Sequence, residues 1–572
     1  MGNECKVPTV WEPEIAKECS SDYNVGPFKV TDPEYTGAGI SITPVLKKYR
    51  ISVFFDGTLN NRGNILARKA NPEYYRKKRD DFFNLHGPGD IVNWSGPGRG
   101  WDSYFSDFSN VALLFDSLNT DTANTDFLKH EKLYIDGIGT RHLQEDEKVI
   151  GASLGMGING VDTKVNDAFR SMGTVLYDFN TPVIDLLTVD VFGFSRGSAA
   201  ARYFVWKLLE EHRNEPQKMR LRVILDANED KIKKVKPQIK SIEVRFAGLF
   251  DTVASHGIDH GNDTEGLHLT AVGSAKKIVH LTAADEYREN FPLTDISRVS
   301  EARKVELSLP GAHSDIGGGY NPVEVEENIQ VFDEDIINPL EQGAANRRVR
   351  NDRNWLINQG WYFPDEFEKK EDQWFAQEEG NFFNELKVTR RKILSDYHRI
   401  PLRIMMNYGK QEGLNFRLPK PLKVTATPLT GNTEKIKAWI EAFGQFSRGE
   451  EVRNYDALGS FTLLEDIRKE LTTEQIAWCE QCALVGLDRY LGEFGRGKGI
   501  TPQKQWKESE KPVWKNYLVE NMIKLVRHRY FHFSARYFYF KTLTDLQDIG
   551  MSPRLIVVDD WTKVREREII PG

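Results

Sequence analysis

The stretch Val189–Arg202, which reads V-D-V-F-G-F-S-R-G-S-A-A-A-R, decides the fold that we expect for this chain. It overlaps the end of an apolar run, Leu186–Phe194, whose pattern is typical of a buried strand. The run breaks at G-F-S-R-G, and a G-x-S-x-G sequence between a strand and a helix is the nucleophile elbow. Both glycines are needed because the serine occupies a strained turn where neighbouring side chains would clash. We therefore expect Ser195 to be a nucleophile at the end of a strand.

The small residues after the elbow predict a helix that lies close to the sheet and begins beside the nucleophile. The N-terminus of such a helix points backbone N–H groups and a partial positive charge at a developing oxyanion. The N–H of Arg196 is the expected first donor, because it directly follows the nucleophile. A second donor should come from another loop at a strand end. Gly57 and Thr58 are the candidates, because they follow the predicted strand Tyr49–Phe55.

An acid and a histidine each follow a later predicted strand. Asp251 comes directly after Ser241–Phe250, and His313 lies in the loop after Lys304–Pro310. Serine, acid and histidine in this order along the chain is the order that an α/β-hydrolase uses. The sequence therefore predicts an α/β fold with a mostly parallel sheet flanked by helices, and with the site at the carboxyl edge of the sheet.

The expected roles follow from triad chemistry. Ser195 attacks an acyl carbon, His313 takes its proton and later delivers it to the leaving alkoxide, and Asp251 holds the imidazole. Asp315 is the rival acid, because it lies two residues beyond the histidine. We expect Asp315 to anchor the glycine-rich loop instead, because it would need a tight local turn to meet the imidazole.

Two further carboxylates follow predicted strands and are candidates for a supporting role. Asp56 ends the strand Tyr49–Phe55, and Asp136 ends a strand that begins at Lys132. Polar residues at the carboxyl ends of strands line the crevice where open α/β sheets bind ligands. The alternative is a plain Asp-Gly turn without chemistry at each place.

Composition excludes several other classes of protein. The chain has 572 residues, 40% of them hydrophobic and 11% aromatic, which is enough apolar material for a large core. A formal net charge of −7 argues against a nucleic-acid binder that works by phosphate neutralisation. No run reaches the roughly 18 apolar residues that a membrane span needs. The segment Met1–Lys6 lacks the features of a signal peptide, so we expect synthesis in the cytoplasm without a cleavable leader.

Punctuation by proline, glycine and charge divides the chain into four expected regions. Residues 1–45 should form an N-terminal arm, and residues 46–325 the catalytic core. Residues 326–470 should form an insertion or cap, and residues 471–572 a largely helical, aromatic-rich region that packs on the core. The aromatic stretch Tyr530–Phe540 has two interpretations, a membrane-contact or acyl-groove surface, or a core element closing on the sheet, and we favour the second.

Three motifs suggest a cofactor or a metal but are better explained without one. Gly155–Gly160 matches G-x-G-x-x-G, but a polar stretch separates it from the preceding strand, as a dinucleotide site would not allow. The histidines and aspartates of residues 256–268 are interrupted by glycines, which favours a solvated loop over a metal site. Cys479 and Cys482 lie one helical turn apart and are interpreted as half-buried small residues. We expect neither a cofactor nor a metal.

Five motifs in order give the chain a resemblance to a known family. They are F-F-D-G-T-L-N-N, Y-I-D-G-I-G-T, F-G-F-S-R-G-S-A-A-A-R, L-F-D-T-V-A-S and P-G-A-H-S-D-I-G-G-G-Y, between residues 50 and 320. This set resembles that of the phospholipase effectors of type VI secretion, the first class of Tle lipases. The family's triad falls on Ser195, Asp251 and His313. Ser198 is a minor departure, since the family often has alanine there, and the resemblance weakens beyond about residue 325.

The resemblance implies an α/β-hydrolase that cleaves phospholipid esters in rival bacteria. It implies a phospholipid membrane as substrate, and a secretion spike or tube component and a cognate immunity protein as partners. The place of action would be the periplasm or the membrane of a target cell. Two alternatives stay open: a binding or delivery module built on an inactive hydrolase fold, and a serine hydrolase that acts on another ester, such as a glycan, polymer or peptide substrate.

Overall fold

The computed structural model describes residues 46–86, 101–146, 160–211, 213–215, 219–228, 234–254, 266–288, 291–336, 350–351, 353–357, 359–362, 366, 375–376, 382–417, 527–528, 530–533, 567 and 569–571, and the account below is confined to them. Residues 48–572 form one unit, and residues 1–47 form another. Outside the described residues lie Cys479 and Cys482, the motif Gly155–Gly160 apart from its last glycine, and most of the region after residue 470.

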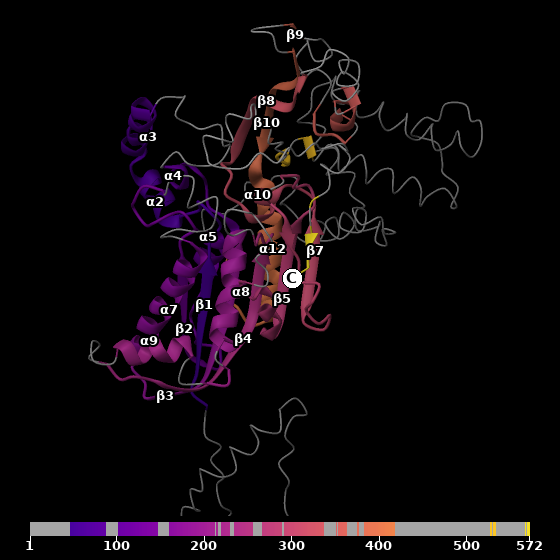
Figure 1. Ribbon diagram of the computed structural model, residues 1–572. Coiled ribbons are helices and arrows are strands. Elements are labelled where there is room, and N and C mark those ends of the chain that lie inside the picture. The colour runs from indigo at the N-terminus through magenta and orange to yellow at the C-terminus, as the bar shows by residue number, and fades with distance from the viewer. Residues whose placement is uncertain are drawn as a thin grey trace, which may run out of the picture. The chain divides into compact units, whose positions relative to one another are not determined.

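A six-stranded sheet organises the described core (Figure 1). In spatial order it consists of β2 (Phe127–Ile135), β1 (Lys48–Phe55), β3 (Val183–Phe194), β4 (Gln238–Phe250), β5 (Lys277–Ala283) and β7 (Lys304–Leu309). Every neighbouring pair is parallel. The chain passes from β1 to β2 on one side and then to β3 on the other, so the sheet has a topological switch point between β1 and β3. In open α/β sheets, ligands bind outside the carboxyl ends of strands at such a point.

Helices cover both faces of this sheet. On one face lie α7 (Val161–Asp178) and α8 (Arg196–Leu209), with α9 (Arg220–Asn228) and the 3₁₀ helix η2 (Leu269–Ser274) beside them. On the other lie α5 (Asn110–Ser117) and α12 (Arg399–Gln411). Adjacent residues of a strand point to opposite faces. Val53 accordingly joins the core under α7 and α8, and Phe54 joins the core under α5 and α12.

The connection between β1 and α5 contains more regular structure than we expect from its charged, Gly- and Pro-rich sequence. It contains α2 (Arg62–Ala70), α3 (Pro72–His86) and the short α4 (Asp102–Phe105). The first helix begins where the Asn61 side chain accepts a hydrogen bond from the N–H of Asn64. Asparagine is a preferred N-cap residue because it satisfies an N–H that lacks a helical partner.

Two smaller sheets and two short helices complete the described structure. A hairpin-like sheet pairs β8 (Val323–Ile336) with β10 (Phe382–Leu394), which also pairs with β9 (Phe375–Ala376). The short α10 (His313–Gly317) follows β7, and η5 (Ser395–His398) leads into α12. The segments β6 (Leu293–Thr294) and β11 (Ile569–Ile570) form a separate parallel pair. Although α12 lies within residues 326–470, where we expect an insertion, its buried face packs on the central sheet.

The prediction of an α/β fold with a parallel sheet flanked by helices is confirmed by this arrangement. Within the described part of the chain, no helix combines the length and apolar character needed to cross a membrane.

Candidate active site

Ser195 lies in a strained turn at the carboxyl end of β3 and at the start of α8. Its φ of 59° and ψ of −128° are rare for a residue with a side chain. A Cβ on Gly193 would lie 2.5 Å from the Cα of Ser198, and one on Gly197 would lie 2.3 Å from the carbonyl oxygen of Asp56. The elbow therefore needs glycine at both positions, and its second glycine contacts the carboxyl end of β1 directly.

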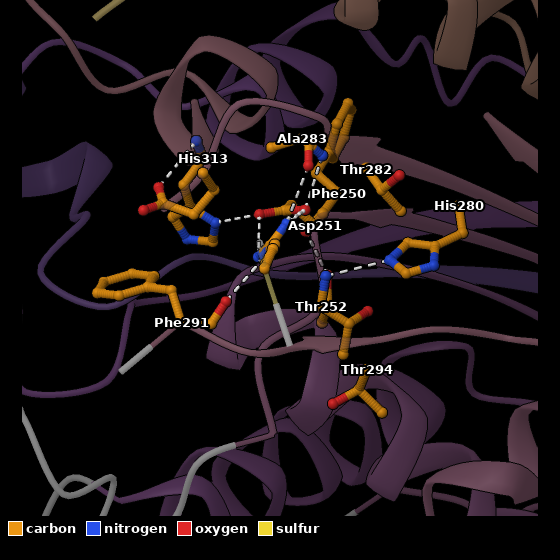
Figure 2. Close-up of polar contacts among 12 residues, drawn as sticks. Phe250, Asp251, Thr252, His280, Thr282, Ala283, Phe291, Thr294 and His313 are labelled. Atoms are coloured by element: carbon orange, nitrogen blue, oxygen red, sulfur yellow. Dashed lines mark hydrogen bonds and ion pairs between the residues drawn. The ribbon is translucent and has the colours of Figure 1, made fainter. Parts of the chain in front are cut away.

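Asp251 and His313 are brought together from two other strand ends. Asp251 ends β4 and has a φ of 41°, and His313 begins α10 after β7. The two side chains meet with 2.5 Å between His313 Nδ1 and Asp251 Oδ2 (Figure 2). The Ser195 N–H donates to the carbonyl of Phe250, so the acid's strand and the elbow are joined through the backbone. All three side chains are buried.

Aromatic rings hold the imidazole from two sides. The ring of Phe194, the residue before the nucleophile, lies 4.6 Å from the His313 ring between centroids, and Phe291 meets it edge-on at 5.0 Å. The backbone N–H of His313 donates to Glu286 Oε2 at 3.2 Å. No hydrogen bond joins the Ser195 hydroxyl to His313 in the described part of the chain. Catalytic hydrogen bonds often tighten only when substrate is bound.

Arg567 makes a two-pronged ion pair with Asp251. Its Nη1 lies 2.6 Å from Oδ1 and its Nη2 lies 2.8 Å from Oδ2, and the N–H of Ala283 also donates to Oδ1 at 2.8 Å. Burial favours the neutral acid, but the Arg567 cation and the His313 hydrogen bond outweigh it and hold the pKa of Asp251 well below its ordinary value. Burial also lowers the pKa of His313, against the opposing effect of Asp251. The imidazole is therefore neutral at pH 7, as a general base must be.

The three predicted oxyanion donors differ in what they already bind. Arg196 is the first residue of α8, where backbone N–H groups lack helical acceptors. The Gly57 N–H already donates to Asp56 Oδ1 at 2.7 Å, which weakens its case as an oxyanion donor. The Thr58 hydroxyl is buried and has no hydrogen-bond partner among the described residues. Of the two candidates in the loop after β1, Thr58 is thus the better one to donate a hydrogen bond to a ligand oxygen.

Asp56 and Asp136 support the loops around the site. Asp56 accepts hydrogen bonds from the Gly57 N–H, the Ser109 hydroxyl and the Tyr134 hydroxyl, and burial raises its pKa to about 6. Burial also raises the pKa of Asp136, which accepts from the side chain of Asn61. Neither contacts the His313–Asp251 pair, so both brace the loop that follows β1.

Asp315 binds a different histidine. Its Oδ1 lies 2.7 Å from His532 Nδ1, and its Oδ2 accepts from the backbone N–H groups of His532 and Ala312. It therefore ties the glycine-rich loop after β7 to the segment around residue 532. Such a contact can anchor the loop, as expected for an acid two residues beyond His313. The imidazole of His313 contacts Asp251 and not Asp315.

Two charged residues of the site are missed by sequence reasoning. Glu286 follows β5, an apolar strand ended by acids just like β1 and β4, so the pattern that identifies Asp251 could have found it. Arg567 has no comparable signal, because it lies 316 positions from its partner and belongs to none of the motifs.

The described residues contain no cluster of three or more His, Cys, Asp or Glu side chains that could hold a metal ion. His256 and His260, which belong to the loop weighed as a metal site, lie outside the described residues.

Comparison with known proteins agrees with the motif pattern. Residues 203–333 match the family model described as the catalytic domain of Tle1-like type VI secretion phospholipase effectors. Among solved structures, the chain is similar to a Tle1 effector bound to the VgrG spike of the type VI secretion system. That match has 24% identity and a TM-score of 0.43, and it covers 74% of this chain and 86% of the other.

A second similar structure is an uncharacterized protein from Pseudomonas aeruginosa, with 15% identity, a TM-score of 0.31, and coverage of 85% of this chain and 65% of the other. No curated protein matches.

The family match begins inside α8, after Ser195, and includes Asp251 and His313. Over these residues, which include the last two of the five motifs, the chain resembles the Tle1-like phospholipase effectors of type VI secretion, and this confirms the predicted resemblance.

Proposed function

We propose that this protein is a serine esterase of the phospholipase A type, with Ser195, His313 and Asp251 as its catalytic triad. The observation that carries the proposal is the 2.5 Å contact of His313 Nδ1 with the Asp251 carboxylate, at the same edge of the sheet as the strained Ser195 turn. This arrangement brings together side chains from three different strand ends. A simple glycine-containing turn at Ser195 would not require Asp251 and His313 to meet beside it.

The geometry suggests the following sequence of steps. Asp251 accepts from Nδ1–H of His313, which leaves Nε2 as the base that takes the proton from the Ser195 hydroxyl. The serine oxygen attacks the acyl carbon, and the oxyanion binds the N–H of Arg196 and a donor of the β1 loop, with Thr58 preferred. His313 then protonates the leaving alcohol. Water, activated by the same imidazole, releases the fatty acid.

The biological setting is the second part of the proposal and rests on the family match. We propose delivery by type VI secretion, with a spike or tube component and a cognate immunity protein as partners. The enzyme would then act on the membrane of a target cell or from its periplasm.

A lipid panel tests the reaction. Purified protein is given vesicles whose phospholipids carry different acyl chains at the two glycerol positions, and fatty acid and lysolipid are both quantified. We expect equal amounts of the two products, and the released chain identifies the position that is cut. Ser195→Ala should lower the rate by on the order of 10³-fold or more while its melting curve stays close to that of the unmodified protein.

A fluorophosphonate probe separates the alternatives. If Ser195 is labelled but no phospholipid is cleaved, the protein is a serine hydrolase for another ester. If neither labelling nor hydrolysis occurs, the inactive binding-module alternative holds and the enzyme proposal is wrong.

A further inference from the structure

We infer that Arg567 is a positioning residue of the triad, whose guanidinium holds the Asp251 carboxylate in the orientation that meets His313. The inference rests on the proposed function, because it assigns a role within the same reaction. Both guanidinium nitrogens bind the acid, Nη1 to Oδ1 at 2.6 Å and Nη2 to Oδ2 at 2.8 Å. A planar fork on a planar carboxylate fixes both its plane and its direction.

The acid has little else to hold it in place. Asp251 lies in the left-handed region with a φ of 41°, and apart from His313 and Arg567 its carboxylate accepts only the N–H of Ala283 among the described residues. Each carboxylate oxygen thus receives two donors, and one of the two comes from Arg567 in both cases. Without the guanidinium, each oxygen keeps a single donor, so the carboxylate stays beside the imidazole but its plane and direction are less firmly fixed.

The arginine is itself held on both sides. Its Nε donates to the carbonyl of Phe291 at 2.8 Å, and its Nη1 also reaches the carbonyl of Ala283 at 3.2 Å. Two residues further on, β11 pairs with β6, whose Thr294 donates its N–H to the carbonyl of Thr252. The side chain is only 7% exposed, so the fork is desolvated and directional.

This arrangement also decides where the shared proton lies. Every other partner of the Asp251 carboxylate is a donor, so the acid stays ionised and the proton of the short contact belongs to His313 Nδ1. The other imidazole nitrogen is then the acceptor that Ser195 needs.

The charge of Arg567 has a second consequence, for the pH at which the imidazole becomes protonated. The charged groups around the Asp251–His313 pair are Arg567, Glu286 and Arg288, and Glu286 is paired with Arg288 at 2.8 Å. When the Arg567 cation is removed, no positive charge offsets the negative charge of Asp251 beside the imidazole. The pair should then take up its proton at higher pH, by about one unit.

The test is the pH dependence of kcat/KM on a soluble short-chain ester for the unmodified protein and for Arg567→Met. We expect kcat to fall by on the order of 10²-fold, since the base is no longer held in line. We also expect the acid limb of the profile to move up by about one pH unit. A loss of structure alone would lower the rate at every pH without moving the limb.

Arg50→Met is the matched control. Arg50 also forms a fork on a buried aspartate, with 2.7 and 2.8 Å to Asp190, and it also binds two carbonyls, those of Glu412 and Gly413. It has no contact with the triad. We expect this variant to be less stable than the unmodified protein but to keep the acid limb in place. An unmoved limb in Arg567→Met would overturn the inference, whatever the rate.

Two further variants cover the case in which Arg567→Met does not fold. Arg567→Lys keeps the charge but cannot form the fork, so we expect a lower kcat with the acid limb near its original position. Methylguanidinium added to Arg567→Ala should restore part of the rate. A lysine variant as fast as the unmodified protein would show that the fork positions nothing. If the unmodified protein is neither active nor labelled at Ser195, the proposed function itself fails, which is a different result.

Discussion

The two aspartates considered as the triad acid, Asp251 and Asp315, are distinguished by their partners. Asp251 faces His313 and Arg567, and Asp315 faces His532 and the N–H of Ala312. Their roles should therefore differ in kind. One orients the base, and the other holds the loop on which the base stands.

The corresponding variants should separate in kcat. Asp251→Asn should lower kcat by on the order of 10⁴ with little change in KM, because the amide holds the wrong tautomer of His313. Asp315→Asn should act more weakly and partly through stability, since it breaks buried hydrogen bonds. Kinetics and thermal melts of both variants on one ester would measure this. An inactive Asp315→Asn beside a nearly normal Asp251→Asn would require the two assignments to be exchanged.

At the scale of elements, the site depends on how closely the loop after β1 approaches the start of α8. The carbonyl oxygens of Phe55 and Asp56 lie where a side chain on Gly197 would begin, at 2.5 and 2.3 Å from its Cβ. Both obstacles are backbone atoms, which cannot rotate away. This close approach joins the start of α8 to the beginning of the loop that carries the candidate oxyanion residue Thr58.

Gly197→Ala should therefore separate the two elements. We expect a loss of unfolding free energy of about 1–3 kcal/mol or more from the forced overlap, together with loss of esterase activity. Gly273→Ala is the control, because its nearest neighbour would be Val299 Cγ2 at an ordinary 3.8 Å. Urea unfolding of both variants measures the difference. Equal unfolding free energies for Gly197→Ala and Gly273→Ala would mean that α8 can move away from the loop after β1 without loss of stability.

The elements that the sequence predicts best are those with a local pattern. The strands ending at Phe55, Phe194 and Phe250 are apolar runs followed by a polar residue or a glycine, and such a run needs no knowledge of the rest of the chain. The same pattern occurs at β5, an apolar strand after which Asp285 and Glu286 follow. The helices α2 and α3 carry many charges, so composition suggests a loop there and obscures them.

Contacts between distant segments could not be predicted in this way. Arg567 reaches Asp251 across 316 positions, and α12 packs on the central sheet from a region expected to be an insertion. The helical spacing of Leu402, Met405, Met406 and Gly409 indicates a buried face on α12 but not the surface on which that face packs. Both contacts depend on how separate segments meet in space. The contact of Asp251 with His313 could be expected from the positions of both residues after predicted strands, and the contact of Asp251 with Arg567 could not.

At the scale of the whole molecule, every proposed chemical step uses groups of the protein itself. Ser195 supplies the nucleophile, His313 the base and Asp251 its orientation. The N–H of Arg196 and the Thr58 hydroxyl supply the oxyanion site. Chelation by EDTA should then leave the hydrolysis rate of a soluble short-chain ester unchanged. Loss of activity that is restored by one divalent ion would contradict this, and would direct attention to residues 256–268.

The stability of the molecule should depend on pH through a second buried histidine, His398. Its Nδ1 lies 2.9 Å from Asn110 Oδ1, and the Asn110 amide donates to the carbonyls of Ile316 and His398, so it links α5, α10 and η5 beside α12. Burial lowers the pKa of His398 to about 3. A histidine whose pKa is lower in the folded than in the unfolded chain stabilises the fold fully above pH 6.5, and this contribution is lost as the pH falls toward 3.

His398→Gln keeps a hydrogen-bond donor for Asn110 and removes the titration. Between pH 7 and pH 4.5 the unmodified protein should therefore lose about 2–3 kcal/mol more unfolding free energy than the variant does. Other titrating groups, such as the buried Asp56, are present in both proteins and cancel in the comparison. Urea unfolding of the two proteins at both pH values gives the difference directly. Parallel losses would mean that protonated His398 is accommodated without disturbing the contact among α5, α10 and η5, and that acid weakens the fold elsewhere.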